Sequence, residues 1–490
     1  MKPRALLLLL LLVVVGGPAP LAASGSKPVL VHYMPWFIAK PYSSSWGWHW
    51  TMNHFDPDTL TAAGKRDIAS WYYPLIGPYD SADPAVLEYH VLLMKLSGID
   101  GVIVDWYGMD NYADYAGIEQ RTAALLYYTR KAGLAFSLCY EDQTVQHEID
   151  GGFIKASDAV ARARQTLLYA QAHYFTDPTY FRWSNQPVLF NFGPQFFKAS
   201  ADWQAIFSGL AANQQPAFFT EDNRLAAGVG AFNWPPMCLS QDNGGVLSTT
   251  QLESYLVGFE QKARQAPAWP AFVSSAFPRF HDIYATAGVS ASLGYRDDNN
   301  GGTLRQTLSR AMTNASLCVQ LVTWNDFGEG TVFEPTEEYG YRDLGTVQDF
   351  RRRYLAPDFP YHTNDLTLAL RLFNLRRAYA TNTLITAELD RVFMNIVSGK
   401  LVAADLQLAG VESKLPVIYD LSCAAGQLSF LIGGYLSSSG VQVQSATNLE
   451  TTAWKTIETY PPTTDPMAFT NRVLPQAGPV FFKARAPGGP

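Results

Sequence analysis

Two acidic residues three positions apart are the feature of the sequence that most directly suggests chemistry. Asp326 and Glu329 lie in the segment TWNDFGE (323–329). Hydrolysis of a glycosidic bond normally uses two carboxyl groups, one that protonates the leaving oxygen and one that assists on the other side of the sugar. Glycine adopts backbone angles that other residues avoid, so Gly328 and Gly330 allow a turn that points both acids into one cleft. We therefore predict Glu329, with its longer side chain, as the general acid and Asp326 as its carboxylate partner.

Other acids compete for the same roles. The pairs Glu141-Asp142 and Glu221-Asp222 also follow apolar runs. Neighbouring residues on a strand point to opposite faces, so only one member of each pair can face a cleft. The alternative for all these acids, including the 326/329 pair, is an ordinary carboxylate at the rim of a barrel, paired with Arg or capping a helix. Trp324 is expected to exclude water from one carboxyl and so raise its pKa.

The elements that must position these acids are strands of a predicted barrel. Continuous apolar runs suit parallel strands that are buried on both faces. Eight such runs occur, at 29–37, 101–108, 135–142, 187–194, 216–223, 230–237, 271–280 and 318–330. Amphipathic helical patterns fill most of the gaps, at 119–132, 158–173, 201–212, 250–265, 303–313 and 366–379, whereas 224–229 is too short for a full helix. Repeated β-then-α units of this number predict an α/β fold, a (β/α)8 TIM barrel.

An open, doubly wound sheet is the alternative fold, and the absence of a Gly-rich phosphate-binding turn after the first run argues against it. In a TIM barrel the working residues lie at the carboxyl ends of the strands. Those ends are rich in polar and aromatic groups, which suits a sugar cleft because pyranose rings offer apolar faces and many hydroxyls. We predict as substrate-binding residues Tyr33, Trp36, Trp48, His49, Trp50, Asp105, Trp106, Tyr140, Glu141, Asn191, Glu221, Trp234, Arg279, Trp324 and Asn325.

Two parts of this set, the residues of one loop segment and Asp105, have equally weighted alternatives. The segment WGWHWTMNH (46–54) is either a wall on which substrate stacks or a buried plug of its loop, since Trp is usually largely buried. Asp105 is either a ligand of a substrate hydroxyl or a buried structural acceptor.

We expect neither a metal site nor a cofactor. His49 and His54 are five residues apart, but neither an HExxH pattern nor a third ligand accompanies them. A serine hydrolase is disfavoured because the chain has no GxSxG elbow. The four Cys are too few for a disulfide scaffold, and Cys139, Cys238 and Cys318 fall in apolar runs, so these three are expected to be buried free thiols.

Size and charge limit the organisation and the partners. At 490 residues the chain exceeds what one core usually supports, and its net charge of −7 argues against binding to nucleic acid or an anionic membrane. We predict a barrel over 28–385, a helical connector over 386–414 with helical texture at 388–408, and a small β-sandwich-like domain over 415–490. Its strand-like pieces are 417–421, 427–432, 441–445, 454–459 and 479–484.

The N-terminus is predicted to be a signal peptide, residues 1–24. A basic start (1–4) precedes an unbroken apolar run (5–15) and a stretch rich in small residues (18–26). The run is short for a bilayer span, so removal is favoured over the alternative of an uncleaved anchor. We therefore expect a secreted, periplasmic or cell-surface protein that has no membrane contact after this removal.

The segment TWNDFGE, followed by GTVFEP (330–335), resembles the signature of the related glycoside hydrolase families 71 and 99. Family 71 contains fungal α-1,3-glucanases with a WNDYGE-type segment, and family 99 contains endo-α-mannosidases and endo-α-mannanases with a NEWHEGTQIEP-type segment. Asp326 follows the family 71 form, whereas Glu-Gly-Thr (329–331) and Glu334-Pro335 follow the family 99 form. The segments VHYMPWF and GIDGVIVDWYG are also similar to bacterial family 71/99-like proteins, and the resemblance covers about residues 28–380.

This resemblance implies a (β/α)8 fold, cleavage of α-glycosidic bonds and no cofactor. Family 71 enzymes invert configuration. In family 99 one carboxylate deprotonates the sugar 2-hydroxyl, which attacks the anomeric carbon, and the Glu three residues later is the acid/base. Carried over, Glu329 matches the acid/base and Asp326 its partner, with Asp in place of the family 99 Glu.

That replacement shortens the partner, so our main hypothesis is a secreted, endo-acting α-glucanase acting on α-1,3 bonds. The alternatives are an endo-α-mannanase or mannosidase of the family 99 type and a catalytically silent carbohydrate-binding barrel. A polysaccharide or oligosaccharide is the expected partner in every case.

Overall fold

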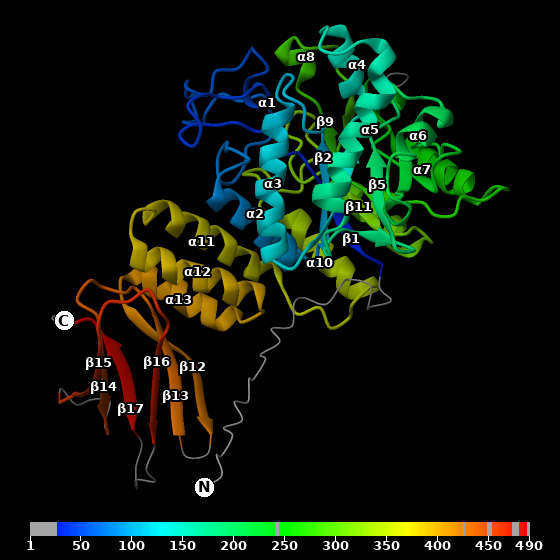
Figure 1. Cartoon of the computed structure of the whole chain (residues 1–490). Helices are drawn as coiled ribbons and strands as arrows, with labels where there is room; N and C mark the ends of the chain where they lie inside the picture. Colours follow the sequence, from blue (N-terminus) through cyan, green and yellow to red (C-terminus); the bar gives the residue numbers. More distant parts are fainter. Residues whose placement is uncertain (1–26, 241–244, 425–426, 448–452, 473–479, 488–490) are drawn as a thin grey trace, which may run out of the picture.

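The computed structural model describes residues 27–240, 245–424, 427–447, 453–472 and 480–487. The predicted signal peptide, 1–24, lies outside the described residues. The centre of the larger body is a path of eight parallel strands (Figure 1). They are β1 (Val29–Tyr33), β2 (Gly101–Trp106), β3 (Ala135–Tyr140), β5 (Gln186–Asn191), β6 (Ala217–Glu221), β7 (Gly230–Phe232), β8 (Ser274–Ala276) and β11 (Val319–Leu321).

The sheet closes on itself. Its order is β7-β6-β5-β3-β2-β1-β11-β8, so the strands follow one another around the ring in chain order. A parallel bridge between Phe232 and Val273 joins the two ends, where the N–H of Val273 donates to the carbonyl of Ala231 at 3.0 Å. Each of the eight predicted apolar runs coincides with one of these strands, and only β5 begins one residue before its run. The predicted TIM barrel is confirmed, and the open sheet is excluded.

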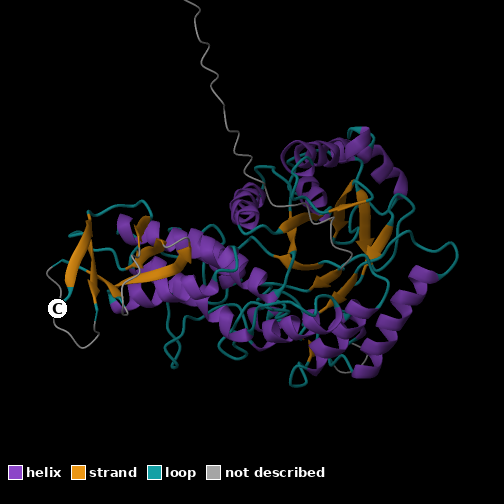
Figure 2. Cartoon of the chain, turned by 90° about the horizontal axis from the view of Figure 1, so that it is seen from below, coloured by secondary structure: helices purple, strands orange, loops and turns teal. Residues whose placement is uncertain are grey.

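Helices surround the strands on the outside (Figure 2). The six predicted helical patterns correspond to α3 (Tyr115–Lys131), α5 (Ala159–Ala170), α6 (Ser200–Phe207), α7 (Thr249–Arg264), α9 (Gly302–Thr313) and α11 (Thr367–Ala378). Two more long helices are α2 (Pro84–Ser97) and α10 (Arg342–Tyr354). Between β6 and β7 the described chain forms no helix, as the short 224–229 gap predicts.

Short elements lie in the loops between barrel units. They are α1 (Trp48–Thr51), α4 (Gln143–Asp150), α8 (Tyr284–Ala287), the strand β4 (Arg182–Trp183), which pairs with β5, and the antiparallel pair β9 (Phe280–His281) and β10 (Tyr295–Arg296).

The part after the barrel begins with two helices, α12 (Thr383–Val397) and α13 (Leu401–Ser413). They replace the single helical stretch predicted at 388–408, because the chain turns at Gly399, whose φ is 77°. Helices α11, α12 and α13 lie between the barrel and the C-terminal strands (Figure 1).

Six C-terminal strands form two antiparallel sheets, β12-β13-β16 and β15-β14-β17. Phe430, Val443 and Phe469 share one core between the sheets, which makes a small sandwich. The strands are β12 (Pro416–Ala424), β13 (Gln427–Gly434), β14 (Val441–Ala446), β15 (Lys455–Tyr460), β16 (Met467–Arg472) and β17 (Phe481–Arg485). Five of them correspond to the predicted pieces. The sixth, β16, was not predicted, because only two apolar side chains, Met467 and Phe469, mark its buried face.

The thiols differ from the prediction at one position. Cys139 and Cys318 are buried, whereas Cys238 and Cys423 are exposed. The expectation for Cys238 is wrong because this residue lies in a 3-10 turn, Met237–Leu239, beyond the end of β7.

Among the described helices, none is both long enough and apolar enough to cross a bilayer.

Candidate active site

A pocket of about 170 Å³ lies beyond the carboxyl ends of β1, β2 and β11. Most of its wall comes from the loops that follow these strands, and the loop after β8 adds one tyrosine. The lining residues are Trp36, Phe37, Trp48, His49, Met52, Tyr107, Tyr284, Asp326 and Gly328. The pocket therefore combines aromatic rings with a single carboxylate in its wall.

A tight turn holds Asp326 and Glu329 together. The N–H of Glu329 donates to Oδ1 of Asp326 at 2.9 Å, and the N–H of Asp326 donates to Oγ1 of Thr323 at 2.8 Å. The N–H of Gly330 closes the turn on the carbonyl of Asp326 at 2.9 Å. Gly330 has a φ of 72°, and a Cβ atom there would lie 2.7 Å from the carbonyl oxygen of His281. The turn therefore requires glycine at 330.

Asp326 lines the pocket although its side chain is almost fully buried, at 4% exposure. Burial raises the pKa of this carboxyl to about 6, against the N–H groups of Glu329 and Gly328, which stabilise its ionised form. The group is therefore largely ionised at neutral pH.

Glu329 has the higher pKa of the two acids. Burial raises its pKa well above the usual value, and the negative charges of Asp326, Asp282 and Glu221 raise it further. A hydrogen bond from Trp234 acts in the opposite direction. The Oε2 atom of Glu329 has no hydrogen-bond partner among the described residues. Glu329 therefore keeps its proton to higher pH than Asp326 does, which is the division a general acid and a base require.

The tryptophan that contacts Glu329 is Trp234, at the end of β7, and not Trp324. Trp324 is buried in the barrel core, with its ring centroid 5.5 Å from that of His90. Its backbone N–H bonds to the carbonyl of His32 at 2.6 Å, which continues the pairing of β11 with β1 past the end of the strand. Trp324 therefore packs within the protein.

The two acids of the pair Glu141-Asp142 have different roles: Asp142 binds backbone N–H groups of a loop, and Glu141 lies among the other acids of the site. Asp142 accepts hydrogen bonds at 2.7–2.9 Å from three successive backbone N–H groups, at 195–197, and so anchors the loop after β5. Burial raises the pKa of Glu141 well above its usual value, and the charges of Asp105, Asp142, Glu221 and Glu329 add to this effect. Glu141 is therefore the member of the pair that lies among the other site acids.

The pair Glu221-Asp222 divides in the same way. Asp222 accepts a hydrogen bond from the hydroxyl of Tyr255. Burial and the charge of Asp222 raise the pKa of Glu221 to about 7, and Glu221 in turn acts on Glu329. In both pairs one acid is a structural acceptor, and the other is part of the electrostatic environment of Glu329.

The 46–54 segment was predicted to be either a wall on which substrate stacks or a buried plug of its loop. Trp48 and His49 lie at the pocket, whereas Trp50 is buried. Trp48 is 41% exposed at the pocket, and His49 stacks on Trp36 with centroids 4.1 Å apart and planes 2° apart. Trp50 is fully buried, and its Nε1 donates to the carbonyl of Tyr79 at 2.8 Å. Burial lowers the pKa of His49 to about 3, so this imidazole is a neutral, flat surface.

Several predicted residues make contacts inside the protein wall. The Tyr33 hydroxyl lies 3.0 Å from Nδ1 of His90, and Nε1 of Trp106 donates to Glu119 at 2.6 Å. The amide of Asn191 donates to the carbonyl of the buried Tyr140 at 2.6 Å. These contacts support the strand ends behind the pocket.

Arg279 and Asn325 are also held by the protein itself. Arg279 is buried in an ion pair with Asp343 and donates to the carbonyl of Val332 at 2.9 Å. Asn325 accepts from the N–H of Met34 at 2.8 Å and donates to its carbonyl at 3.0 Å, which joins the segments that follow β11 and β1.

The predicted substrate-binding set omits part of the pocket wall. Phe37, Met52, Tyr107 and Tyr284 line the pocket but were not in that set. Tyr107 was within reach of sequence reasoning, because it directly follows Asp105-Trp106 at the end of β2. Tyr284 belongs to α8 in a long loop, and no periodic pattern places it near a strand end.

Three buried residues, His32, Asp105 and Cys139, form a group of possible metal ligands. Asp105, 2% exposed, has its Oδ1 4.0 Å from Nε2 of His32. Burial and the charge of Asp326 raise the pKa of Asp105 well above its usual value. Together with Cys139 these residues form a cluster that sequence reasoning missed, since each comes from a different strand.

Comparison with known proteins gives a match in the first half of the chain. Residues 27–215 match the model of glycosyl hydrolase family 99. A glycoprotein endo-alpha-1,2-mannosidase-like protein of Danio rerio is 34% identical over 88 residues, which are 16% of this chain and 20% of that protein. The glycoprotein endo-alpha-1,2-mannosidase of Mus musculus is 36% identical over 87 residues, 18% of this chain and 15% of that protein. The matches thus span a fifth or less of the length of these relatives.

Solved structures with a similar course of the chain include a GH99 endo-alpha-mannosidase from Bacteroides thetaiotaomicron. It has 17% sequence identity and a TM-score of 0.48, and the alignment covers 66% of this chain and 97% of that one. A structure described as a glycoside hydrolase-like protein has 12% identity and a TM-score of 0.48, with 70% of this chain and 98% of that one covered.

The matched segment runs from β1 to the chain just before β6, and the Asp326–Glu329 turn lies outside it. The family match therefore rests on a different part of the chain from the motif around 323–335. Because the match and the motif agree, the resemblance of this chain to the family 71 and family 99 glycoside hydrolases is confirmed.

Proposed function

We propose that this protein is a glycoside hydrolase that cleaves α-glycosidic bonds, with Glu329 as general acid and Asp326 as its carboxylate partner. One observation carries the proposal. The Glu329 N–H donates to Asp326 Oδ1 at 2.9 Å, so one turn holds two carboxyls, of which Asp326 lines the pocket. Their different pKa values support different protonation states at neutral pH.

The chemistry follows from those states. Protonated Glu329 gives its proton to the glycosidic oxygen as the bond to the anomeric carbon breaks. Ionised Asp326 accepts a proton from the attacking group, which is either water or the sugar 2-hydroxyl. Trp36 lines the pocket, where its ring offers an apolar surface on which a sugar ring can stack. The stacked rings of Trp36 and His49 provide a rigid aromatic wall.

For the substrate we propose an α-mannoside cleaved within a chain or glycan. The family 99 match and the mannosidase names of the relatives support this alternative over α-1,3-glucan, which no comparison supports specifically. Asp326 is shorter than the family 99 Glu by about one methylene, so α-1,3-glucan belongs in the same assay.

The test is hydrolysis by the wild-type protein, Glu329→Gln and Asp326→Asn on α-mannan and α-1,3-glucan. We expect cleavage of α-mannan by the wild type and a loss of about 10²–10⁴-fold in each variant, the usual contribution of general acid–base catalysis. Glu337→Gln is the control, because this carboxyl forms a surface ion pair with Lys65. An unchanged rate in Glu329→Gln would refute its role as the acid.

Two other outcomes are informative about the alternatives. Cleavage of α-1,3-glucan alone would replace the mannoside proposal. Binding of glycans by the wild type without cleavage at any pH would identify a silent carbohydrate-binding barrel.

We also propose that the protein is exported, on the basis of the basic start and apolar run within residues 1–24. Fractionation of cells that express the full chain tests this: a product still carrying residues 1–24 in the cytoplasm would contradict it.

A further inference from the structure

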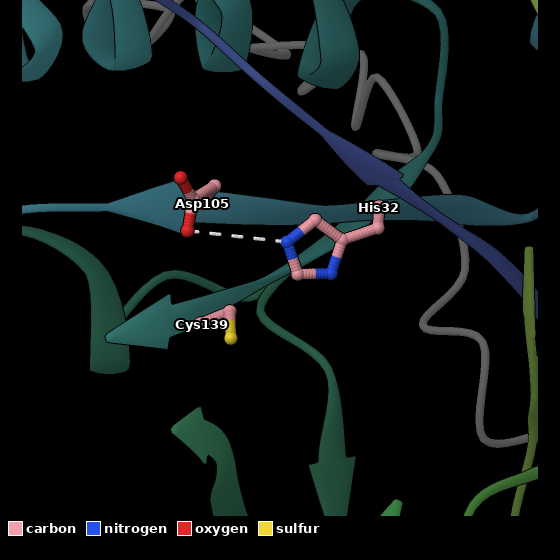
Figure 3. A group of neighbouring side chains, drawn as sticks. All are labelled: His32, Asp105 and Cys139. Atoms are coloured by element: carbon pink, nitrogen blue, oxygen red, sulfur yellow. Dashed lines mark ion pairs between the residues drawn. The ribbon is translucent and has the colours of Figure 1, made fainter. Parts of the chain in front are cut away.

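His32, Asp105 and Cys139 face one another inside the barrel (Figure 3). They come from the adjacent strands β1, β2 and β3, and Asp105 is directly opposite Cys139 in the β2–β3 register. One potential ligand atom from each residue lies within 4.8 Å of the other two, and the His32 Nε2 to Asp105 Oδ1 distance is 4.0 Å. The barrel topology thus gathers a nitrogen, an oxygen and a sulfur donor at one point.

The three side chains are almost inaccessible to solvent, with exposures of 1%, 2% and 0% for His32, Asp105 and Cys139. Buried polar groups in proteins normally have hydrogen-bond partners, and exceptions need an explanation. Nδ1 of His32 has no such partner among the described residues. Among the ion pairs of the described residues, the nearest basic group to Asp105 is this imidazole, 4.0 Å away, and burial lowers the pKa of His32 to about 3, so the imidazole is neutral. Packing alone does not account for this arrangement.

A bound divalent cation does account for it. Imidazole, thiolate and carboxylate are the three ligand types of Zn²⁺ sites, whereas Ca²⁺ and Mg²⁺ select oxygen ligands. A neutral imidazole, one carboxylate and one thiolate carry two negative charges, which a divalent cation cancels. That balance matters here because an uncompensated charge is very unfavourable in a buried, low-dielectric site.

The dimensions are close to those required. With metal–ligand bonds of about 2.0–2.3 Å in a tetrahedron, ligand atoms lie roughly 3.3–3.8 Å apart. The present separations, up to 4.8 Å, exceed this by about 1.5 Å at most, which side-chain rotations can remove.

We propose that His32, Asp105 and Cys139 form a binding site for a divalent cation of the zinc type. The protein supplies three ligands, and the fourth position is left to water or another small ligand. Our expectation that His49 and His54 do not form a metal pair does not bear on this site, because the ligands of this site are brought together only by the strand order. The proposal is independent of the hydrolase function.

The experiment uses Co²⁺, which replaces Zn²⁺ and reports on its ligands by absorption. The protein is treated with a chelator, dialysed and titrated with Co²⁺ in a Cys238→Ser/Cys423→Ser background, because the two exposed thiols would bind metal adventitiously. We expect saturation near about one equivalent, a thiolate-to-cobalt charge-transfer band and the intense visible bands of tetrahedral cobalt.

The matched variants are Cys139→Ser and Cys318→Ser, since both thiols are fully buried but only Cys139 belongs to the cluster. Cys139→Ser is expected to lose the charge-transfer band, and Cys318→Ser to keep it. Asp105→Asn preserves shape and is expected to weaken affinity at least about tenfold, which tests the site even if Cys139→Ser does not fold. The proposal is overturned if the background protein shows no thiolate band, or if Cys139→Ser retains it.

Discussion

The backbone N–H of Glu329 donates a hydrogen bond to the carboxylate Oδ1 of Asp326 at 2.9 Å. The donor belongs to the residue whose side chain is the proposed acid, and the acceptor is the proposed base. This bond stabilises the ionised form of Asp326, while the resulting negative charge raises the pKa of Glu329. One short turn thus fixes the positions of both carboxyls and separates their protonation states.

We predict a bell-shaped dependence of kcat/KM on pH. Activity should rise as pH passes about 6, where Asp326 loses its proton, and fall at higher pH, where Glu329 loses its own. In Asp326→Asn the ascending limb should disappear from the residual activity. Initial rates on α-mannan across the pH range measure both limbs, and an activity that stays constant from acid pH through neutrality contradicts the assignment.

Stability should fall as Glu221 ionises. Burial raises the folded-state pKa of Glu221 from 4.5 to about 7, so the folded protein binds this proton more tightly than the unfolded chain does. Its contribution to the free energy of unfolding is therefore fully present below pH 4.5 and is lost as pH rises through 7. Glu221→Gln should reduce the decrease in Tm between acid and neutral pH. Glu337→Gln, a surface variant, should leave that decrease unchanged, and an equal effect of the two would contradict the prediction.

Trp48 and Trp50 should respond differently to truncation although they are two residues apart. Trp48→Ala removes a ring that is 41% exposed at the pocket and should raise KM with little change in Tm. Trp50→Ala removes a fully buried ring and its hydrogen bond to Tyr79, and should lower stability by about 3–5 kcal/mol. Denaturant unfolding and substrate titration of both variants check this, and an unaltered KM in a folded Trp48→Ala protein would remove Trp48 from the site.

Gly330→Ala should destabilise the turn that carries the acids. A φ of 72° is unfavourable for alanine, and its Cβ would lie 2.7 Å from the carbonyl oxygen of His281. We expect a loss of about 1–3 kcal/mol in the free energy of unfolding. Gly328→Ala is the comparison, because its φ is not left-handed and its Cβ would meet the flexible end of Met52 at 3.0 Å. Equal unfolding free energies for Gly330→Ala and the wild type would show that the turn tolerates a side chain.

The barrel was within reach of the sequence because its strands are buried on both faces and therefore appear as continuous apolar runs. All eight runs coincide with a strand, and the short 224–229 gap correctly indicates a missing helix. The acids and glycines of the motif at 323–329 led us to propose Asp326 and Glu329 as the catalytic pair, and this assignment stays a prediction. The strand β16 could not be predicted in the same way, because only two apolar residues, Met467 and Phe469, indicate its buried face.

Which side chains contact one another in the site is determined only by the tertiary structure. Which member of Glu141-Asp142 faces the other acids depends on the loop N–H groups at 195–197 that bind Asp142, and these come from a different barrel unit. Likewise, Trp234 contacts Glu329 from β7, although Trp324 is closer in the sequence.

The cluster of His32, Asp105 and Cys139 is the clearest case, since each residue alone is an ordinary polar side chain on a buried strand. Sequence periodicity determines that a residue lies on a strand, whereas neighbours, pKa and hydrogen-bond partners depend on which strands adjoin. That order is set only when the sheet closes.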